Sequence, residues 1–421
     1  MRKITIIGGG QAGLQLGIGL LQKGYRVRIV QNRTAEDIAT GRVLSSQCMF
    51  SNALAHEAAL GIDFWAKDCP PVQGINFIVP NPDGSGTRLI DWAARLDRDA
   101  LSVDQRVKVP RWMAEFGRLG GEMVIADAGI AEIDAYAAED DLVIVASGKG
   151  EVGRMFARDA EKSAYDKPMR ALALTYVTGM TPRQPHSAVE FNLIPGVGEY
   201  FVFPALTTTG PCEIMVFEGI PGGPMDCWAD VTTPEAHLAK SLEILTTFLP
   251  WEYERSKNCQ LTDANGILAG RFAPTIRHPV ATLPSGRKVL GLGDAVCLND
   301  PITGQGSNNA AKAAAVYLDR ILAHGEAPFD EAFMQGTFDA FWAYAQWVVR
   351  WTNMLLLPPP PFILDIMGAA CGEPRLAHRM ANGFWLNDQL TDFSLEPVIN
   401  GKPAANAVAP RKAPRSSMSP S

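Results

Sequence analysis

Length, composition and charge exclude several protein classes. The chain has 421 residues, of which 47% are hydrophobic and 20% charged, and its formal net charge is -7 at pH 7. The length and balance are typical of a globular protein with two domains, and a nucleic-acid surface would need clustered Lys and Arg instead. The 7 cysteines form no C-x-x-C pair, so neither a disulfide framework nor a metal site is predicted. We expect a cytoplasmic enzyme in a reducing compartment.

The chain is not expected to enter a membrane or to carry a secretion signal. Its most apolar late stretch, residues 354–357, runs directly into four prolines and cannot form a spanning helix of about twenty residues. A glycine turn stands near the N-terminus, where a signal peptide would need its apolar core.

Apolar runs and helical spacing predict nucleotide-binding elements in separate parts of the chain. Residues 3–31 have the pattern of a strand–helix–strand unit, in which the apolar run at 4–7 is a strand buried on both faces. Gly24 is placed to end the helix, which is expected over 12–23. Further elements of the same kind are a helix over 109–117, strands over 142–148 and 288–292, and a helix over 307–324.

The pattern between these elements changes to strands separated by Pro/Gly turns. Antiparallel strands are expected at 171–177, 200–203 and 213–217, with one helix over 233–249. The fold class is therefore α/β: a Rossmann-like domain (1–44, 101–165 and 286–325) interrupted by a mixed β-sheet substrate domain (45–100 and 166–285). C-terminal helices (326–400) close the structure, and the Pro/Ala/Ser tail (401–421) is expected to be disordered.

A glycine turn between the first strand and the first helix predicts dinucleotide binding. Its glycines permit a tight turn, close approach of the backbone to a pyrophosphate, and close packing of helix on strand. The residues assigned to the cofactor here are Gly8, Gly10, Gln11, Ala12 and Gly13. The acidic residue that usually binds the adenosine ribose is missing after the second strand. Asn32 or Arg33 would have to replace it, although a solvated loop charge is an equal alternative for Arg33.

A second motif stands nearly three hundred residues later. Gly293-Asp294 follows a predicted strand, and an aspartate at such a strand end can accept hydrogen bonds from a sugar hydroxyl. The loop that follows opens a helix and presents backbone N–H groups to an anion or a polar ring. The alternative is that Asp294 caps a helix and the loop is only a turn. The loop residues are Pro301, Ile302, Thr303, Gly304, Gln305 and Gly306.

The two motifs together resemble the single-chain fold of para-hydroxybenzoate hydroxylase and its relatives. The resemblance implies an FAD-binding domain in which both motifs hold FAD and residues 301–304 face the flavin ring. It also implies that Arg42 and Leu44 lie near the flavin and that Arg106 starts a helix beside the cofactor; surface arginine is the alternative for each Arg.

Members of that superfamily that reduce their own flavin carry a mid-chain Asp-Gly motif. This chain has Lys149-Gly150-Glu151 in that region, and its Asp83-Gly84 falls in a predicted surface turn. We therefore expect an NADH-dependent flavin reductase, a transient partner, to supply reduced FAD.

The resemblance is most specific to the oxygenase component of the two-component styrene and indole monooxygenases, and it extends to about residue 395. Besides the motifs above, it rests on Val103-Asp104-x-Arg106, Gly148-Lys149 and Arg350-Trp351-Thr352-Asn353. Six pocket residues resemble the indole branch and not the styrene branch: Ser45, Gln47, Met49, Val72, Ile75 and Ala100. The spacing of the first three would place them on one face of a strand, and ordinary half-buried sheet residues are the alternative.

The family resemblance implies that reduced FAD and O₂ form a C4a-hydroperoxide that epoxidises the C2–C3 bond of indole, leading to indoxyl and indigo. No acid or base catalyst is needed, which agrees with the absence of a Ser/His/Asp set. The alternatives are a styrene epoxidase or aryl sulfide oxygenase of the same family, a flavin-dependent halogenase, an NAD-dependent dehydrogenase and a non-catalytic flavin carrier. A homodimer is left open.

Overall fold

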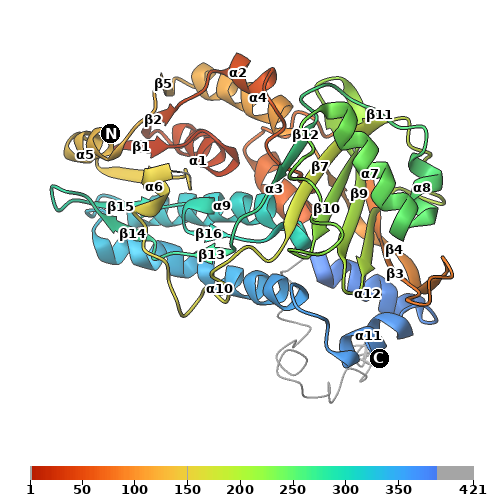
Figure 1. The fold of residues 1–421 in the computed structure, drawn as a ribbon. Helices are drawn as coiled ribbons and strands as arrows, with labels where there is room; N and C mark the ends of the chain where they lie inside the picture. Colours follow the sequence, from red (N-terminus) through yellow and green to blue (C-terminus); the bar gives the residue numbers. More distant parts are fainter. Residues whose placement is uncertain (1, 149, 386–421) are drawn as a thin grey trace, which may run out of the picture.

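The computed structural model describes residues 2–148 and 150–385, and the tail predicted for 401–421 lies outside this range. Two sheets stand side by side, and each has its own helices (Figure 1). The N-terminal sheet and the glycine motifs occupy one half of the molecule, while the larger sheet fills the other. Among the described helices, none combines the length and the apolar character that a membrane-spanning segment requires.

The N-terminal sheet has six strands in the order β14-β15-β6-β1-β2-β5. All neighbours pair in parallel except β14, which is antiparallel to β15. Its strands are β1 (Lys3–Ile7), β2 (Arg26–Gln31), β5 (Glu122–Ile125), β6 (Leu142–Val145), β14 (Val280–Thr282) and β15 (Lys288–Gly291). This confirms the α/β class. β14 lies in the range 166–285, which the sequence analysis gave to the substrate domain. It belongs to the N-terminal sheet instead, because it pairs antiparallel with β15.

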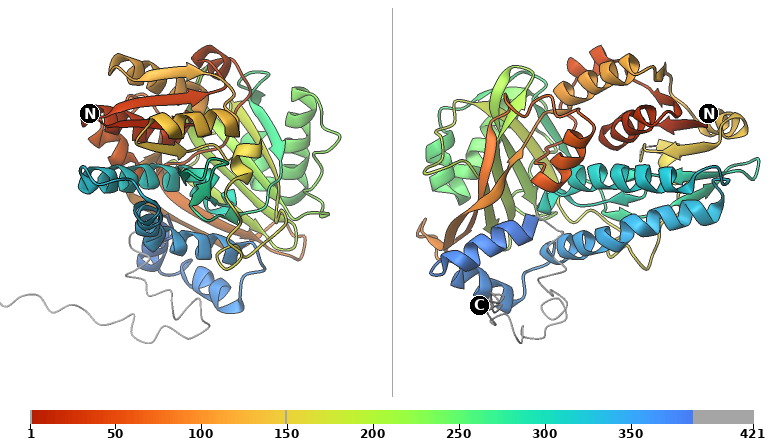
Figure 2. Two further views of the ribbon diagram at one scale, coloured as in Figure 1. Left: turned by 90° about the vertical axis from the view of Figure 1, so that its left-hand side faces the viewer. Right: turned by 180° about the vertical axis from the view of Figure 1, so that it is seen from behind.

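Helices pack on this sheet and form one apolar core with it. α1 is in contact with both α4 and α9, and α10 lies along α9, as Figure 2 shows from behind. These helices are α1 (Gln11–Gln22), α4 (Gln105–Arg118), α5 (Ile130–Glu139), α9 (Gly306–His324) and α10 (Glu331–Leu355). Short helices α2 (Ala35–Ala39), α3 (Ser51–Ala59) and α6 (Gly150–Arg154) connect the layers.

The second sheet has eight strands, mostly antiparallel, in the order β11-β7-β10-β9-β8-β3-β4, with β12 also paired to β7. Only the β3–β8 pair in this sheet is parallel among the described strands. The strands are β3 (Pro71–Pro80), β4 (Arg88–Leu101), β7 (Ala171–Thr178), β8 (Val189–Ile194), β9 (Gly198–Thr207), β10 (Gly210–Gly219), β11 (Gln260–Leu261) and β12 (Ile267–Gly270). A separate pair joins β13 (Thr275–Ile276) to β16 (Cys297–Leu298).

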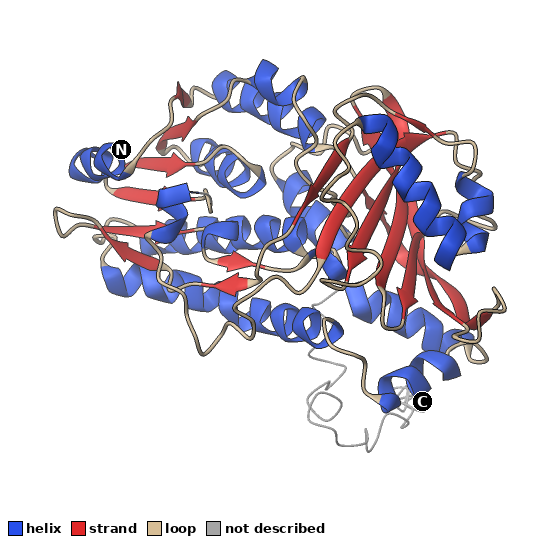
Figure 3. Ribbon diagram, in the orientation of Figure 1, coloured by secondary structure: helices blue, strands red, loops and turns tan. Residues whose placement is uncertain are grey.

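The two faces of the large sheet bury different apolar clusters. One face packs under α7 (Pro234–Phe248) and α8 (Pro250–Ser256), which Figure 3 shows in front of the strands. The opposite face contributes to a cluster that includes residues of α11 (Pro361–Ala369), α12 (Pro374–Trp385) and the 301–304 loop. The C-terminal helices therefore serve both halves: α10 packs on α9, and α11 and α12 pack on β4.

Candidate functional site

The glycine turn is shaped by contacts that leave no room for side chains at two positions. Gly8 has φ +112°, and a Cβ atom there would lie 3.0 Å from the backbone carbon of Ala146 at the end of β6. A Cβ atom on Gly13 would lie 2.0 Å from the carbonyl oxygen of Gly8. The turn, the helix α1 and the strand β6 are thus closer together than they could be with any residue other than glycine at positions 8 and 13.

The same turn is open on its outer side. A Cβ atom on Gly10 would meet nothing within 4 Å, and the N-terminus of α1 has neither a side-chain cap nor an acidic residue in its first turn. The N-terminus of α9 is alike, since Gly306 also faces open space and its first turn holds no acid. Free N–H groups at two helix N-termini attract anions. These residues therefore fit the phosphate groups and polar rings of a dinucleotide.

The two glycine motifs meet in space. A Cβ atom on Gly293, which has φ +60°, would lie 3.4 Å from the Cβ atom of Ala12. The contact is reinforced by Gln15, whose amide donates to the carbonyl oxygen of Ala311 in α9 at 2.8 Å. Gly293 and Asp294 form a short 3₁₀ turn, η1 (Gly293–Ala295), and Asp294 is exposed at its surface.

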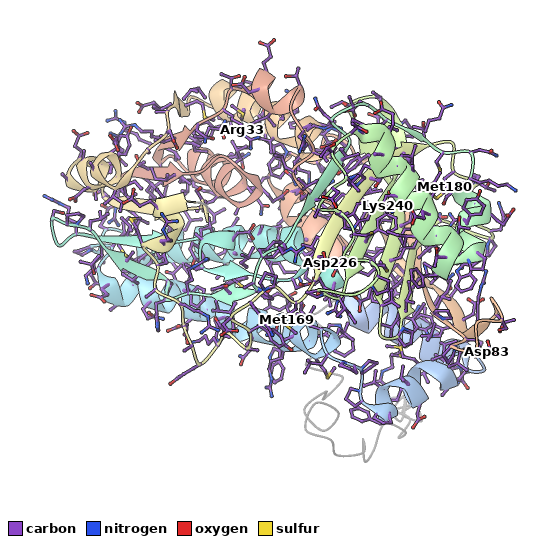
Figure 4. The ribbon with its side chains drawn as sticks, viewed as in Figure 1. Arg33, Asp83, Met169, Met180, Asp226 and Lys240 are labelled. Atoms are coloured by element: carbon purple, nitrogen blue, oxygen red, sulfur yellow. The ribbon has the colours of Figure 1, made fainter. Side chains whose placement is uncertain are left out.

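The end of β2 supplies a polar group that the sequence analysis did not assign. A Cβ atom on Gly9 would lie 2.0 Å from Oε1 of Gln31, so the Gln31 carboxamide lies directly against the glycine turn. Its Nε2 donates to the carbonyl oxygen of Arg33 at 2.8 Å. Asn32 is exposed and Arg33 is half-buried; Figure 4 labels Arg33 in the region between α1 and α4. The signal that could have found Gln31 is its position as the last residue of the strand.

Hydrogen bonds fix the 301–304 loop. Asp300 caps the 3₁₀ turn η2 (Pro301–Thr303), with Oδ1 accepting from the Ile302 amide at 3.1 Å. The Thr303 hydroxyl lies 2.6 Å from that of Thr352 in α10, and Gly304 ends the turn with φ +63°. Gln305 is buried and Gly306 exposed. The loop is therefore anchored to α10 through Thr352, and its glycines lie at the N-terminus of α9.

The two predicted arginines have different surroundings. Arg106 does start α4, as the resemblance implied, but its guanidinium is buried and binds Asp104 at 2.9 Å and Asp263 at 2.9 and 3.0 Å. Arg42 is exposed, and Leu44 packs against the core of the N-terminal half. The ion pairs explain why Arg106 is not available as a free cation, because both carboxylates hold it in place.

Four predicted residues come together in one apolar cluster. Val72, Ile75 and Ala100 are at most 2% exposed and share this cluster with Ile302 of the loop. Val72 and Ala100 are direct neighbours across the β3–β4 pair. The large sheet therefore presents an apolar surface, suited to an aromatic molecule, to the loop predicted to face the flavin.

The segment that carries the other three predicted pocket residues is not a strand, so the expectation of one shared strand face is wrong. The Ser45 hydroxyl donates to Oε1 of Gln47 at 3.0 Å, and Tyr176 of β7 donates to the carbonyl oxygen of Ser45 at 2.8 Å. Met49 instead forms an isolated bridge with Leu101 and lies in a separate cluster with α3 and α9. Within this segment, pairing with β4 is limited to the single bridge at Met49.

A buried ion pair behind the glycine turn is a further feature that the sequence did not reveal. Nζ of Lys108 lies 2.6 Å from Oε1 of Glu57, and both side chains are 2% exposed. The amide of Gln11 donates to the same carboxylate oxygen at 3.1 Å, and the Met49 sulfur lies 3.1 Å from Nζ. This pair links the first residue of α1 to α3 and α4.

The chain's Asp83-Gly84 pair lies in the hairpin loop between β3 and β4. Asp83 is exposed, and its carboxylate accepts from the Ser85 amide at 2.8 Å. Figure 4 places Asp83 at the far side of the large sheet, remote from α1 and the glycine turn. The Asp-Gly pair is therefore a surface turn, as the sequence predicted.

Comparisons with known proteins agree with this geometry. The family model "Styrene monooxygenase A putative substrate binding domain" matches residues 148–255. The chain is 29% identical over 374 residues to styrene monooxygenase StyA of Pseudomonas fluorescens, covering 86% of this chain and 88% of that protein. StyA of a Pseudomonas species is 28% identical over 370 residues.

Solved structures show the same fold at low sequence identity. The flavin-dependent brominase Bmp2 has a TM-score of 0.65 at 14% identity, covering 95% of this chain and 99% of that chain. The tetrameric form of 2-methyl-3-hydroxypyridine-5-carboxylic acid oxygenase has a TM-score of 0.53 at 15% identity, covering 90% and 93%. At such identities the likeness concerns the fold and not the substrate.

Proposed function

We propose that the chain is a flavoprotein monooxygenase of the styrene monooxygenase family and that it transfers one oxygen atom from O₂ to the C2–C3 double bond of indole. The observation that carries the proposal is the meeting of Val72, Ile75 and Ala100 with Ile302 of the loop beside the two open helix N-termini. The apolar sheet face therefore packs on the loop that leads into the open N-terminus of α9.

The cofactor proposed is FAD. The uncapped N-terminus of α1 at Gly10 would hold the pyrophosphate, and the N-terminus of α9 with the 301–304 loop would hold the flavin ring. Asp294 and Gln31 are proposed to bind sugar hydroxyls, since both lie next to the glycine turn or its partner motif. When bound in reduced form, flavin activates O₂ for transfer of one oxygen atom to an electron-rich double bond.

The work of the protein is to position the substrate and to exclude water. Burial of Val72, Ile75 and Ala100 makes a wall that cannot hydrogen-bond to water. Gln47 is 2% exposed, and its Oε1 already accepts from Ser45, which leaves a second lone pair for a donor. We propose that Gln47 accepts the indole N–H, a contact that styrene cannot offer.

Reduced FAD is proposed to come from a separate NADH-dependent flavin reductase. Support comes from the placement of Asp83-Gly84 at a hairpin tip, away from the nucleotide turn. The decisive check is spectroscopic: NADH added anaerobically to the FAD-loaded protein should leave the flavin absorbance unchanged until a reductase is added. Bleaching by NADH alone would contradict this part of the proposal.

The test of the activity combines the purified protein with a flavin reductase, NADH, FAD, catalase and indole in air. Blue indigo that depends on this chain is the expected result, and a Gly10→Glu variant is the matched control because its carboxylate would block the phosphate site. The second candidate is styrene epoxidation, favoured by the named relatives. A kcat/KM for styrene above that for indole would replace the indole proposal with the styrene one.

A further inference from the structure

A buried cluster of three carboxyl groups and one guanidinium lies beneath the 301–304 loop. Its members are Asp300, Glu218 of β10, Glu199 of β9 and Arg170, and each is at most 4% exposed. Glu218 and Glu199 are direct neighbours across the β9–β10 pair, so their side chains stand on the same face of the sheet. The cluster therefore places three acids around a single buried cation.

Arg170 is already committed to one of the three acids. Its Nε and Nη2 donate to the two oxygens of Glu199 at 2.7 and 2.9 Å, a bidentate pair. Its Nη1 donates to the carbonyl oxygens of Met169 and Leu356 at 2.9 and 3.1 Å, which ties the pair to the end of α10. Little of the guanidinium is left to neutralise a second carboxylate.

Glu218 meets Asp300 instead of a cation. Both oxygens of Glu218 are buried, and within the described chain neither has an N–H or hydroxyl partner. The group that acts on its carboxyl group from nearby is the carboxyl group of Asp300. Two carboxyl groups can form a hydrogen bond only when one of them carries a proton, because two carboxylates hold acceptors alone.

Charge and burial identify Glu218 as the proton carrier. Burial, followed by the charges of Asp300 and Glu199, raises the pKa of Glu218 well above its usual range. Burial also raises the pKa of Asp300, but the hydrogen bonds from Glu218 and the Ile302 amide act in the opposite direction and favour its charged form. Burial raises the pKa of Tyr165, on which Arg170 and Asp300 act in opposite directions, and its hydroxyl donates to the carbonyl oxygen of Asn353 at 2.8 Å.

We propose that Glu218 is a positioning residue: it remains protonated at neutral pH and donates a hydrogen bond to Asp300, which holds the 301–304 loop in place. Asp300 transmits the effect because its other contact is the cap on η2. Loss of the shared proton would leave two buried carboxylates that repel each other beneath the loop. The position of the loop is then linked to pH.

The first test measures the proton without using any activity. A group that is protonated only in the folded state makes the unfolding equilibrium constant rise about tenfold per pH unit above its unfolded pKa and up to its folded pKa. Replacing it with an amide, Glu218→Gln, keeps the donor but cannot titrate. In this variant the free energy of unfolding, measured with urea, should therefore depend less steeply on pH between about pH 6 and about pH 8. The difference in slope should correspond to one proton. An unchanged slope would overturn the proposal.

The second test measures the loop in the same flavin-free protein. Hydrogen exchange of a peptide covering residues 300–306 should be near wild type in Glu218→Gln, which still donates. In Glu218→Leu it should be faster by about tenfold at the same pH, the cost of one buried hydrogen bond. Glu213→Gln is the matched control, on the same strand but on the opposite face of the sheet. Equal rates of hydrogen exchange at residues 300–306 in Glu218→Leu and Glu213→Gln would contradict the positioning role of Glu218.

The third readout rests on the proposed function. With reduced FAD supplied, Glu218→Leu should divert O₂ from the organic product to hydrogen peroxide, and Glu218→Gln should restore the wild-type ratio. If no organic product forms with any variant, the proposed function fails, while the slope and exchange results still decide the role of Glu218. If product forms but its share of consumed O₂ is unaffected in Glu218→Leu, the link to the reaction is wrong.

Discussion

The carboxamide of Asn308 donates to the carbonyl oxygen of Cys48 at 2.8 Å, although 260 residues separate them in the chain. The same amide group donates to the carbonyl oxygen of Gly304 at 3.0 Å, and its oxygen accepts from the Phe50 amide at 2.9 Å. One side chain therefore ties the loop predicted to face the flavin to the segment that carries Gln47. The proposed cofactor side and the proposed substrate side are therefore held by a common anchor.

Replacing Asn308 with Ala should remove all three bonds at once. We expect the free energy of unfolding to fall by about 2–3 kcal/mol, because buried backbone groups are left unpaired. Urea unfolding of the flavin-free protein provides the measurement, and Asn81→Ala in the exposed β3–β4 hairpin is the control. Equal stability of the two variants would mean that the anchor contributes little.

Replacement by Ala should impair FAD binding at Gly10 but protein stability at Gly13. Gly10→Ala adds a methyl group that meets no protein atom within 4 Å, so folding should be unaffected while FAD binding weakens by about tenfold or more. Gly13→Ala would force a methyl group to 2.0 Å from the Gly8 carbonyl oxygen, so the protein itself should be destabilised. Melting temperature and FAD titration separate the two effects. Strong FAD binding by Gly10→Ala would place the phosphates elsewhere.

Breaking the Lys108–Glu57 pair should be costly. Lys108→Met leaves a buried carboxylate without its cation, which typically lowers the free energy of unfolding by about 3–5 kcal/mol. The double variant with Glu57→Gln should recover part of that loss, since no buried charge remains. Lys240→Met, at the exposed pair with Glu243, is the control and should leave stability unchanged. No recovery in the double variant would show that packing of the lysine chain matters more than charge.

Substrate preference should depend on Ser45 and Gln47 and not on Met49. The pair Ser45→Asn and Gln47→Val removes the polar contact proposed for indole and should shift the indole-to-styrene ratio of kcat/KM by about tenfold toward styrene. Adding Met49→His should instead reduce stability, because Met49 is 1% exposed and its sulfur lies 3.1 Å from the Lys108 ammonium. Ser85→Asn in the exposed hairpin serves as the control. An unchanged ratio in the double variant would remove both residues from the specificity argument.

Features that depend on the local backbone could be predicted from the sequence. The turn at Gly8 needs φ +112°, which favours glycine, and the helix that follows ends near Gly24 with φ +83° for the same reason. Hydrophobic periodicity likewise located α7 and α9 nearly to the residue, since a helix that packs on a sheet must repeat its apolar face. The alternation of residues from 45 to 49 suggested a strand, but the segment pairs with β4 only through the single bridge at Met49.

The amino-acid sequence by itself determined the α/β class, the glycine turn and the apolar character of the strands, because these follow from backbone sterics and from the spacing of apolar residues. Only the tertiary structure decided which charges meet. Arg106 is committed to Asp104 and Asp263, and Arg170 is committed to Glu199, which leaves both buried oxygens of Glu218 without a donor among the described residues. Such pairings join residues that are distant in the chain, and their energies depend on burial and distance, which no local pattern records.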